Sequence, residues 1–269
     1  MTGLTIWHQV NAMKIISWNV NGIRSCAQKG LFDFLAKENP DFLCLQEHKA
    51  HPDLLENSIV SPQGFQSYWS SAQRKGYSGV VTYTRRTPDE VRYGIGLQKY
   101  DAEGRFVILR YGDLLIYNVY FPNGSAGEDR HLFKQEFLQK FAFHLKKQID
   151  AGLKVIVLGD YNVAYLEHDV FDPVRLSTIS GFLPIERKWF GQFLKDGFID
   201  TFRYLHPDEK ERYSWWSYQE NARMVNRGWR IDHICVTQNL KAAIRSANIL
   251  EDQMGSDHCP VVLEMDLKA

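Results

Sequence analysis

The chain has 269 residues, of which 44% are hydrophobic, 13% aromatic and 24% charged. This composition excludes a disordered, collagen-like or coiled-coil protein and indicates a packed globular protein of one large domain or two ordinary ones. The 32 basic residues equal the 32 acidic residues, so the formal net charge is zero. No global electrostatic field therefore draws the protein to nucleic acid or to an anionic membrane, and any polyanion has to be bound by local groups.

No apolar run approaches the roughly 20 residues that span a bilayer, and the first residues have neither the basic nor the apolar region of a signal peptide. The cysteines form no CxxC pair, so we expect reduced, buried thiols. They are Cys26, Cys44, Cys235 and Cys259. These features predict a cytoplasmic protein without a membrane partner, or a nucleoid or nuclear one if the source requires it. We also expect a monomer.

The domain boundaries follow from the start of the first clear strand pattern and from the lack of a linker. Residues 1–12 precede a second methionine, Met13, and are predicted to be an N-terminal extension. No Pro-, Gly- or Ser-rich linker and no repeat divides the remainder. Residues 13–269 are therefore predicted to form one domain.

In chain order, short runs rich in β-branched and aromatic residues predict at least eight strands. They are Lys14–Trp18, Phe42–Leu45, Gly79–Thr84, Phe106–Arg110, Leu114–Tyr120, Lys154–Leu158, Arg230–Thr237 and Pro260–Met265. Apolar residues at helical spacing predict helices between some of these strands. The helical stretches are Gly22–Lys37, Asp129–Ile149 and Glu186–Lys195.

The order of these elements predicts an α/β fold with mixed sheets. Strands and helices alternate in places, whereas residues 106–120 indicate an antiparallel hairpin that turns at residues 111–113. Several strands, such as Val155–Leu158, are apolar on both faces and need cover on both sides. Two sheets packed face to face with helices outside would supply that cover. The long irregular segments are candidate substrate loops: Ala50–Gly64, Pro122–Glu128, Phe171–Pro184 and Pro207–Glu220.

Polar side chains stand at one end of several predicted strands. They are Asn19 and Asn21, Glu47, Asp160 and Asn162, and Asp257 with His258. Carboxylates and carboxamides are costly to bury unpaired against apolar strands, so we expect them to converge. Such oxygens suit Mg²⁺ or Mn²⁺, with waters or a phosphate completing the coordination. Histidine and cysteine are too sparse there for a zinc site.

Nine short blocks run in order from Met13 to the C-terminus. They are WNVNG (18–22), LQEHK (45–49), GYSGV (76–80), YFPNG (120–124), GDYN (159–162), SGFLPIER (180–187), YSWWSY (213–218), RGWRIDH (227–233) and GSDHCP (255–260). In order and spacing they resemble the motifs of the exonuclease III type of apurinic/apyrimidinic endonucleases. The resemblance implies a four-layer α/β-sandwich of the DNase I-like endonuclease/exonuclease/phosphatase superfamily. It also implies a Mg²⁺-dependent DNA repair phosphodiesterase.

The resemblance implies a metal site at the strand ends. Glu47 matches the principal Mg²⁺ ligand of the family, with Asp257 and Asn21 nearby and the carboxamide of Asn19 as a further ligand. Mn²⁺ would suit the same oxygens. The alternative is a structural glutamate at a strand end that pairs with Lys49 or with an arginine.

The family also implies catalytic roles. Asp160 matches the residue that handles the proton of the water or of the leaving group and is positioned by Asn19. Asn162 matches the carboxamide that orients the nucleophile or stabilises the transition state. His258 and Asp232 match a pair in which the carboxylate fixes the imidazole tautomer and the imidazole contacts the scissile phosphate.

Further matches concern the substrate. Tyr120 matches a tyrosine whose hydroxyl faces the phosphate, although a tyrosine at a strand end is often only packed. Trp215, Trp229 and Ile231 match an apolar pocket for an extrahelical abasic deoxyribose, whereas Trp216 is interpreted as ordinary core.

Several polar residues are candidates for binding the DNA backbone. Asn123, Arg74, Lys75 and the basic run Arg223, Arg227 and Arg230 are the residues concerned. The alternative for each basic side chain is a merely solvated surface charge.

Some positions depart from the family pattern. The segment after Asp169 reads VFDPVRLSTISG and lacks the asparagines that relatives often carry there to bind phosphate. His48 and His168 stand where other residues are usual. Cys259 is interpreted as a small buried residue rather than a nucleophile or redox switch. Backbone binding and preference among abasic, 3′-blocked and intact ends are therefore left open.

The sequence as a whole predicts a Mg²⁺-dependent apurinic/apyrimidinic endonuclease with 3′ to 5′ exonuclease or 3′-phosphodiesterase activity. Its partner would be double-stranded DNA with abasic or 3′-blocked sites. Another phosphodiesterase or phosphatase of the superfamily would share the metal site but carry different loops from YSWWSY and RGWRIDH. A catalytically silent DNA-binding protein would be expected to lack Glu47, Asp160 or His258, and all three are present.

Overall fold

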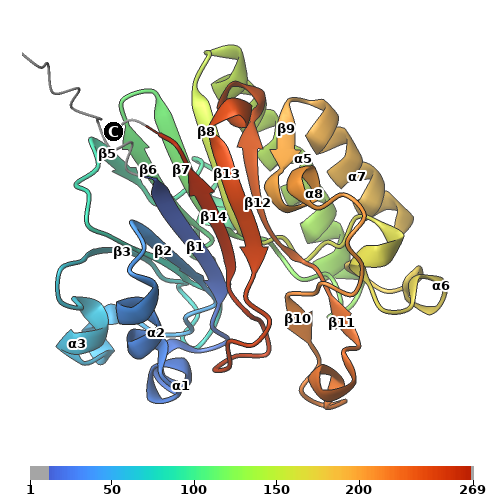
Figure 1. The fold of residues 1–269 in the computed structure, drawn as a ribbon, viewed down its shortest axis with the longest axis horizontal. Coiled ribbons are helices and arrows are strands. Elements are labelled where there is room, and N and C mark those ends of the chain that lie inside the picture. Colours follow the sequence, from blue (N-terminus) through green and yellow to red (C-terminus); the bar gives the residue numbers. More distant parts are fainter. Residues whose placement is uncertain (1–11, 268–269) are drawn as a thin grey trace, which may run out of the picture.

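The computed structural model describes residues 12–267, and two six-stranded mixed sheets form its centre (Figure 1). The predicted extension of residues 1–12 lies outside this range except for Ala12. In the first sheet the order is β13-β14-β1-β2-β4-β3. Its strands are β1 (Met13–Asn19), β2 (Phe42–Gln46), β3 (Gln66–Ser70), β4 (Val80–Thr84), β13 (Ile244–Ile249) and β14 (Val261–Met265).

The second sheet has the order β5-β6-β7-β8-β12-β9. Its strands are β5 (Glu90–Arg92), β6 (Phe106–Tyr111), β7 (Leu114–Tyr120), β8 (Lys154–Asp160), β9 (Phe198–Asp200) and β12 (Asp232–Thr237). The expected hairpin is present, because β6 and β7 are antiparallel and Tyr111 pairs with Leu114. A separate small ribbon, β10 (Trp215–Trp216) and β11 (Gly228–Trp229), extends from one end of the molecule (Figure 1).

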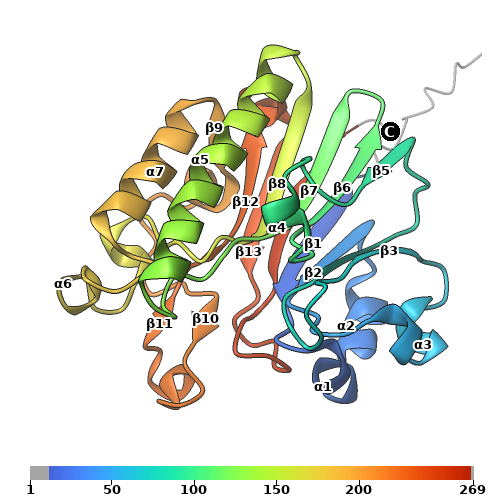
Figure 2. The ribbon, with the colours of Figure 1, turned by 180° about the vertical axis from the view of Figure 1, so that it is seen from behind.

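Helices cover the outer face of each sheet. On the first sheet lie α1 (Ile23–Gln28), α2 (Leu31–Glu38) and α3 (Asn57–Val60), and on the second lie α5 (Glu128–Asp150) and α7 (Pro184–Lys195) (Figure 2). The shorter helices are α4 (Gln98–Asp101), α6 (Pro173–Leu176), α8 (Thr201–Leu205) and the 3₁₀ turns Pro52–Leu54, Glu167–Asp169, Ala222–Val225 and Gln238–Ala243. No helix within residues 12–267 is both long enough and apolar enough to cross a membrane.

The core has the layers that the sequence predicts. One buried cluster lies between the sheets and includes Ile15, Val107 and Ile156. A second joins the outer face of the second sheet to α5 and α7, and a third joins the first sheet to α1 and α2. The four-layer α/β prediction is therefore confirmed. All four cysteines are free and buried, as expected.

Two details of the predicted elements are wrong. The stretch Gly22–Lys37 is not one helix, because the chain turns at Gly30 (φ 94°), a left-handed conformation that interrupts the helix between α1 and α2. The predicted strand Arg230–Thr237 begins only at Asp232. The predicted substrate loops also contain short elements, namely α3, α6 and β10.

Arg230 is buried rather than available to DNA, which corrects its prediction as a phosphate contact. Its guanidinium donates to Asp169 Oδ1 at 2.8 Å and to Asp200 Oδ2 at 2.7 Å, and it is 1% exposed. Arg203 also donates to Asp169, from Nε at 3.0 Å. Burial opposes ionisation of Asp169, but Arg230 and Arg203 lower its pKa to about 2. This cluster ties the 3₁₀ turn before residue 170 to β9 and α8.

We expect Arg230→Met to lower the free energy of unfolding by about 3–5 kcal/mol, because removing one partner of a buried pair leaves uncompensated charges. Urea titration followed by circular dichroism measures this loss. Arg227→Met is the matched control, since Arg227 is exposed in the same segment and its replacement should stay within about 0.5 kcal/mol. Equal, small effects of both substitutions would show that the buried cluster is not needed for stability.

Candidate active site

One row of the second sheet carries three of the predicted catalytic side chains. In the parallel pair, Tyr120 on β7 lies opposite Asp160 on β8, and in the antiparallel pair Asp232 on β12 lies opposite Asp160. Paired residues on neighbouring strands point to the same face of a sheet. The strand register thus brings together residues that are 40 and 72 positions apart (160 − 120 and 232 − 160).

The first sheet supplies the facing set. The parallel strands β1 and β2 end at the same edge, where Asn19 closes β1 and Glu47 follows β2. Asn19 Nδ2 donates to Glu47 Oε2 at 3.0 Å and to Asp160 Oδ2 at 2.9 Å. Asn21 Nδ2 donates to Asp257 Oδ1 at 3.0 Å. The predicted metal and catalytic residues therefore form one connected network across the two sheets.

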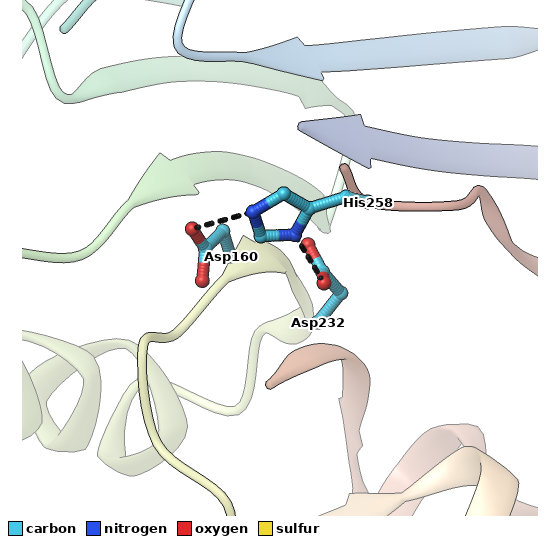
Figure 3. Close-up of side chains that lie close together, drawn as sticks. All are labelled: Asp160, Asp232 and His258. Atoms are coloured by element: carbon cyan, nitrogen blue, oxygen red, sulfur yellow. Dashed lines mark hydrogen bonds and ion pairs between the residues drawn. The ribbon is translucent and has the colours of Figure 1, made fainter. Parts of the chain in front are cut away.

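His258 lies between two carboxylates (Figure 3). Its Nδ1 is 2.8 Å from Asp232 Oδ2, and its Nε2 is 4.0 Å from Asp160 Oδ2. Burial alone would lower the pKa of His258, but the charges of Asp232, Asp160 and Asp257 raise it to about 10. The imidazole is therefore protonated at neutral pH, so it can donate from both nitrogens and cannot act as a metal ligand in that state.

The carboxyl group of Asp160 can gain or lose a proton near neutral pH. Burial raises its pKa, and the charge of Asp232 adds to this, whereas His258, the Asn162 amide and Asn19 oppose it, giving a pKa of about 7. A carboxyl group with such a pKa suits general acid–base chemistry. Burial and the charges of Glu47 and Asp160 keep the pKa of Tyr120 well above its usual range, so its phenol remains protonated.

Carboxamides complete the surroundings of Asp160. The Asn162 backbone N–H donates to Asp160 Oδ1 at 2.8 Å, and its Nδ2 donates to Asp160 Oδ2 at 3.2 Å. Asn123 Nδ2 donates to Asn162 Oδ1 at 3.0 Å. The exposed Asn123 therefore lies beside the catalytic set, and its predicted role in substrate binding remains a prediction.

These groups line one cavity of about 380 Å³. Its polar wall includes Glu47, Asp160 and Asp257, and its apolar wall includes Trp215, Trp229 and Ile231. The Trp215 and Trp229 rings meet edge to face, with centroids 6.2 Å apart. Trp216 does not line the cavity and is 2% exposed, in agreement with its interpretation as core. Titratable polar side chains and an apolar wall thus share one cavity.

The predicted DNA-binding cations fall in different surroundings. Arg74 and Lys75 are exposed and line a neighbouring cavity of about 590 Å³, together with Arg24, which the sequence reasoning missed. Arg223 instead donates to the backbone carbonyls of Ser256 (3.3 Å) and Gln253 (2.8 Å), so it supports the loop that carries Asp257. Phosphate contacts by these residues remain predictions.

Arg105 is a further residue of this region that the sequence did not indicate, whereas Lys49 is the partner that the structural alternative gave to Glu47. Buried Arg105 donates from Nη1 to the Tyr120 carbonyl at 2.7 Å, and its guanidinium lies 5.0 Å from the centre of the Tyr120 ring. Lys49 Nζ lies 2.9 Å from Glu47 Oε1 and donates to Asn21 Oδ1. The only sequence signal for Lys49 was its position beside Glu47.

Two sets of side chains could hold a metal ion. Asp160, Asp232 and His258 have ligand atoms within 4.8 Å of one another, but the raised pKa of His258 makes this set a poor one. The second set is the predicted one. In it, Glu47 Oε1 and Asn21 Oδ1 both contact the Lys49 ammonium, and Asp257 is joined to Asn21 by a hydrogen bond. Carboxylate and carboxamide oxygens fit a hard divalent ion, so the residues present suit the metal that the sequence predicts.

The fold and this site define a member of the endonuclease/exonuclease/phosphatase family, to which the chain belongs: the family's sequence model matches residues 16–258. An exodeoxyribonuclease of Bacillus subtilis (strain 168) is 40% identical over 256 residues, which are 95% of this chain and 100% of the relative. A DNA-(apurinic or apyrimidinic site) endonuclease of Dictyostelium discoideum is 38% identical over 96% of this chain and 72% of its own length. These matches confirm the predicted resemblance.

A solved structure with the same fold contains DNA. It is the 3′ phosphatase NExo from Neisseria bound to product DNA hairpin, with a TM-score of 0.87 and 29% identity over 95% of this chain and 100% of that chain. The similarity in structure thus extends over both sheets and their helices, and it confirms the DNase I-like fold class.

The raised pKa of His258 predicts a pH dependence of stability. Because the folded pKa is about 10 against an ordinary 6.5, the stabilisation is complete below pH 6.5 and is lost as the pH rises through 10. Between pH 8 and 9.5 this contributes a fall of about 1 kcal/mol per pH unit in the free energy of unfolding. His258→Gln should flatten that slope in urea titrations, and parallel slopes for the two proteins would contradict the assigned charge.

Proposed function

We propose that this protein is a divalent-metal-dependent DNA repair phosphodiesterase, an apurinic/apyrimidinic endonuclease with 3′ to 5′ exonuclease or 3′-phosphodiesterase activity on double-stranded DNA. The observation that carries the proposal is the cavity in which Asp160, protonated His258 and the Glu47 carboxylate face one another beside an apolar wall. The names of the relatives support the choice of DNA as the substrate.

In the proposed hydrolysis, each of these side chains would have a separate role. Mg²⁺, or Mn²⁺, held by Glu47, Asp257 and Asn21 would neutralise charge on the scissile phosphate. Asp160 accepts a proton from the attacking water, and Asn162 holds that water or the developing charge. As the new bond to phosphorus forms, the bond from phosphorus to the 3′ oxygen breaks, and that oxygen takes up a proton from solvent. Protonated His258 donates from Nε2 to a phosphate oxygen while Asp232 fixes its ring, and the phenol of Tyr120 donates to the same group.

The shape of the cavity supports abasic selectivity. A sugar without a base can enter the space beside Trp215, Trp229 and Ile231 at low unstacking cost, whereas an intact nucleotide brings a base that this space has to exclude. The proposed partner is therefore double-stranded DNA with abasic or 3′-blocked sites, bound by a monomer. The corresponding compartment is the one that holds DNA, either the cytoplasm with its nucleoid or a nucleus.

The test uses end-labelled duplexes that carry an abasic analogue, a 3′-phosphate or an intact recessed 3′ end, each with and without Mg²⁺. Metal-dependent cleavage of the abasic or 3′-blocked duplex is expected. Binding without cleavage would favour a silent DNA-binding protein. Cleavage of small phosphate esters only would favour another hydrolase of the family.

We expect Asp160→Asn to lower kcat by at least about 10²-fold, because it keeps the shape of the side chain and removes its basicity. The exposed Asp150→Asn on α5 is the matched control and should turn over like the wild type. Both proteins are assayed on the abasic duplex after circular dichroism shows that they are folded. A folded Asp160→Asn protein with full turnover would remove Asp160 from the mechanism.

Glu47→Gln should raise the Mg²⁺ concentration needed for half-maximal activity more than it raises the KM for DNA, because a carboxamide is a poorer ligand than a carboxylate. Activity should partly return at high Mg²⁺ or with Mn²⁺. A metal titration identical to that of the wild type would instead favour the structural alternative, in which Glu47 only pairs with Lys49.

Trp229→Ala should narrow the ratio of cleavage at abasic and intact sites, because it opens the wall of the cavity. The loss of buried contacts also costs about 3 kcal/mol of stability by analogy with core truncations. Trp216→Ala is the matched control, since Trp216 is buried nearby but outside the cavity. The ratio is measured for both folded proteins, and equal ratios would show that Trp229 is not a selective wall.

A further inference from the structure

A buried ion pair joins the two helices over the second sheet. Lys134 on α5 and Glu186 on α7 lie with Nζ and Oε1 2.5 Å apart, and neither side chain has any exposed surface. Removing two charges from water is expensive, and a buried pair is weak evidence of a gain in stability. The helices also have other contacts, since Trp189 Nε1 donates to the Leu138 carbonyl at 3.0 Å and the two helices share the same hydrophobic cluster. The pair is therefore not needed simply to hold the helices together.

The remaining hydrogen bonds of the pair lead to the walls of the active-site cavity. Lys134 Nζ donates to the backbone carbonyl of Asn162 at 2.7 Å. Glu186 Oε2 accepts from the Gly181 amide at 2.6 Å, and its Oε1 accepts from Ser180 Oγ at 3.1 Å. Asn162, Ser180 and Gly181 all line the cavity. One ion pair thus holds two separate segments of the site.

The backbone of Asn162 is uncommon and faces the Asp160 carboxyl group. Its φ of 52° is in the left-handed region, which asparagine enters more readily than most other residues with a side chain. Its N–H and its side-chain Nδ2 both donate to Asp160. Because Lys134 holds the carbonyl of the same residue, a displacement of the Asn162 backbone would move the donors that face the Asp160 carboxyl group.

The second segment held by the ion pair, which contains Gly181, packs closely against the cavity wall. A Cβ atom on Gly181 would lie 3.2 Å from Trp229 Cζ3 and 3.4 Å from the Asn162 carbonyl oxygen, so this backbone packs directly against both. A shift of the Gly181 peptide would change the apolar wall of the cavity as well as the surroundings of Asn162.

We propose that Lys134 and Glu186 are positioning residues, which fix the Asn162 peptide against Asp160 and the 180–183 segment against Trp229. The inference rests on the proposed function, because the reaction that these residues serve is the one proposed above. Neither side chain lines the cavity, so both reach it through the residues that they hold, which are Asn162, Ser180, Gly181 and Leu183.

The test is the double variant Lys134→Met with Glu186→Gln, which removes the hydrogen bond to Asn162 without leaving an unpaired buried charge. Since misplacing a reacting group by about 1 Å can cost about 10²-fold, we expect kcat on the abasic duplex to fall 10- to 100-fold while KM changes less than about threefold. Lys146→Met is the control on the same helix, because Lys146 is exposed and pairs with Asp150 at the surface.

A second arm separates positioning from a general loss of stability. The double variant is repeated in an Asn162→Ala background, which removes the Nδ2 donor to Asp160. We expect a smaller further loss there than the 10- to 100-fold loss in the wild-type background, because part of that loss acts through this donor. Hydrogen exchange of peptides covering residues 160–183 should be faster in the double variant than in Lys146→Met.

Each outcome has a distinct meaning. A wild-type protein that cleaves none of the duplexes would overturn the proposed function itself. An active wild type with an unchanged kcat in the folded double variant would overturn the positioning role alone. Equal losses with and without Asn162→Ala, or unchanged hydrogen exchange at residues 160–183, would also overturn it.

Discussion

The buried carboxamide of Asn19 is the interaction on which the rest of the site depends. Its NH₂ group donates to a carboxylate of each sheet, Glu47 at 3.0 Å and Asp160 at 2.9 Å. Two carboxylates brought together in a low dielectric repel one another, and a neutral double donor lessens that cost without neutralising either group. Glu47 (φ 57°) and Asn162 (φ 52°) both adopt left-handed backbone conformations beside this contact. The fold therefore keeps unfavourable backbone conformations at the point where the carboxylates of the two sheets meet.

Much of this arrangement could be predicted from the sequence because it follows from local pattern. Apolar runs identify the central strands, and a polar side chain directly after such a run has to lie at the edge of a sheet. Asn19, Glu47 and Asp160 are all of this kind. Their convergence could also be expected, because buried carboxylates need partners. The register that places Asp232 opposite Asp160 adds the last catalytic neighbour, and that register became visible only in the structure.

What could not be predicted depends on pairing between distant residues. The strands β3, β5, β9 and β13 are short or half-exposed, so their sequences lack the continuous apolar run that identifies a central strand. Arg230 and exposed Arg227 belong to the same basic run, yet only Arg230 meets Asp169 and Asp200, which lie 61 and 30 positions away. Nothing in the local sequence separates a buried arginine from a solvated one when its partners are that far along the chain.

The same distant pairs also lie on either side of the segment that lacks the asparagines expected from the family pattern. Residues 170–179 lie between two buried anchors, Asp169 with its arginines and Glu186 with Lys134. Within that span Val174 is 85% exposed, whereas Val170 and Leu176 are buried in one cluster with Trp229 and Ile231. Changes at the exposed positions therefore disturb few buried contacts. Because the anchors hold both ends, the segment can vary in sequence while Asn162 and Asp160 stay in place. The exposed middle of this loop is thus separated from the pairs that hold Asn162 and Asp160 in place.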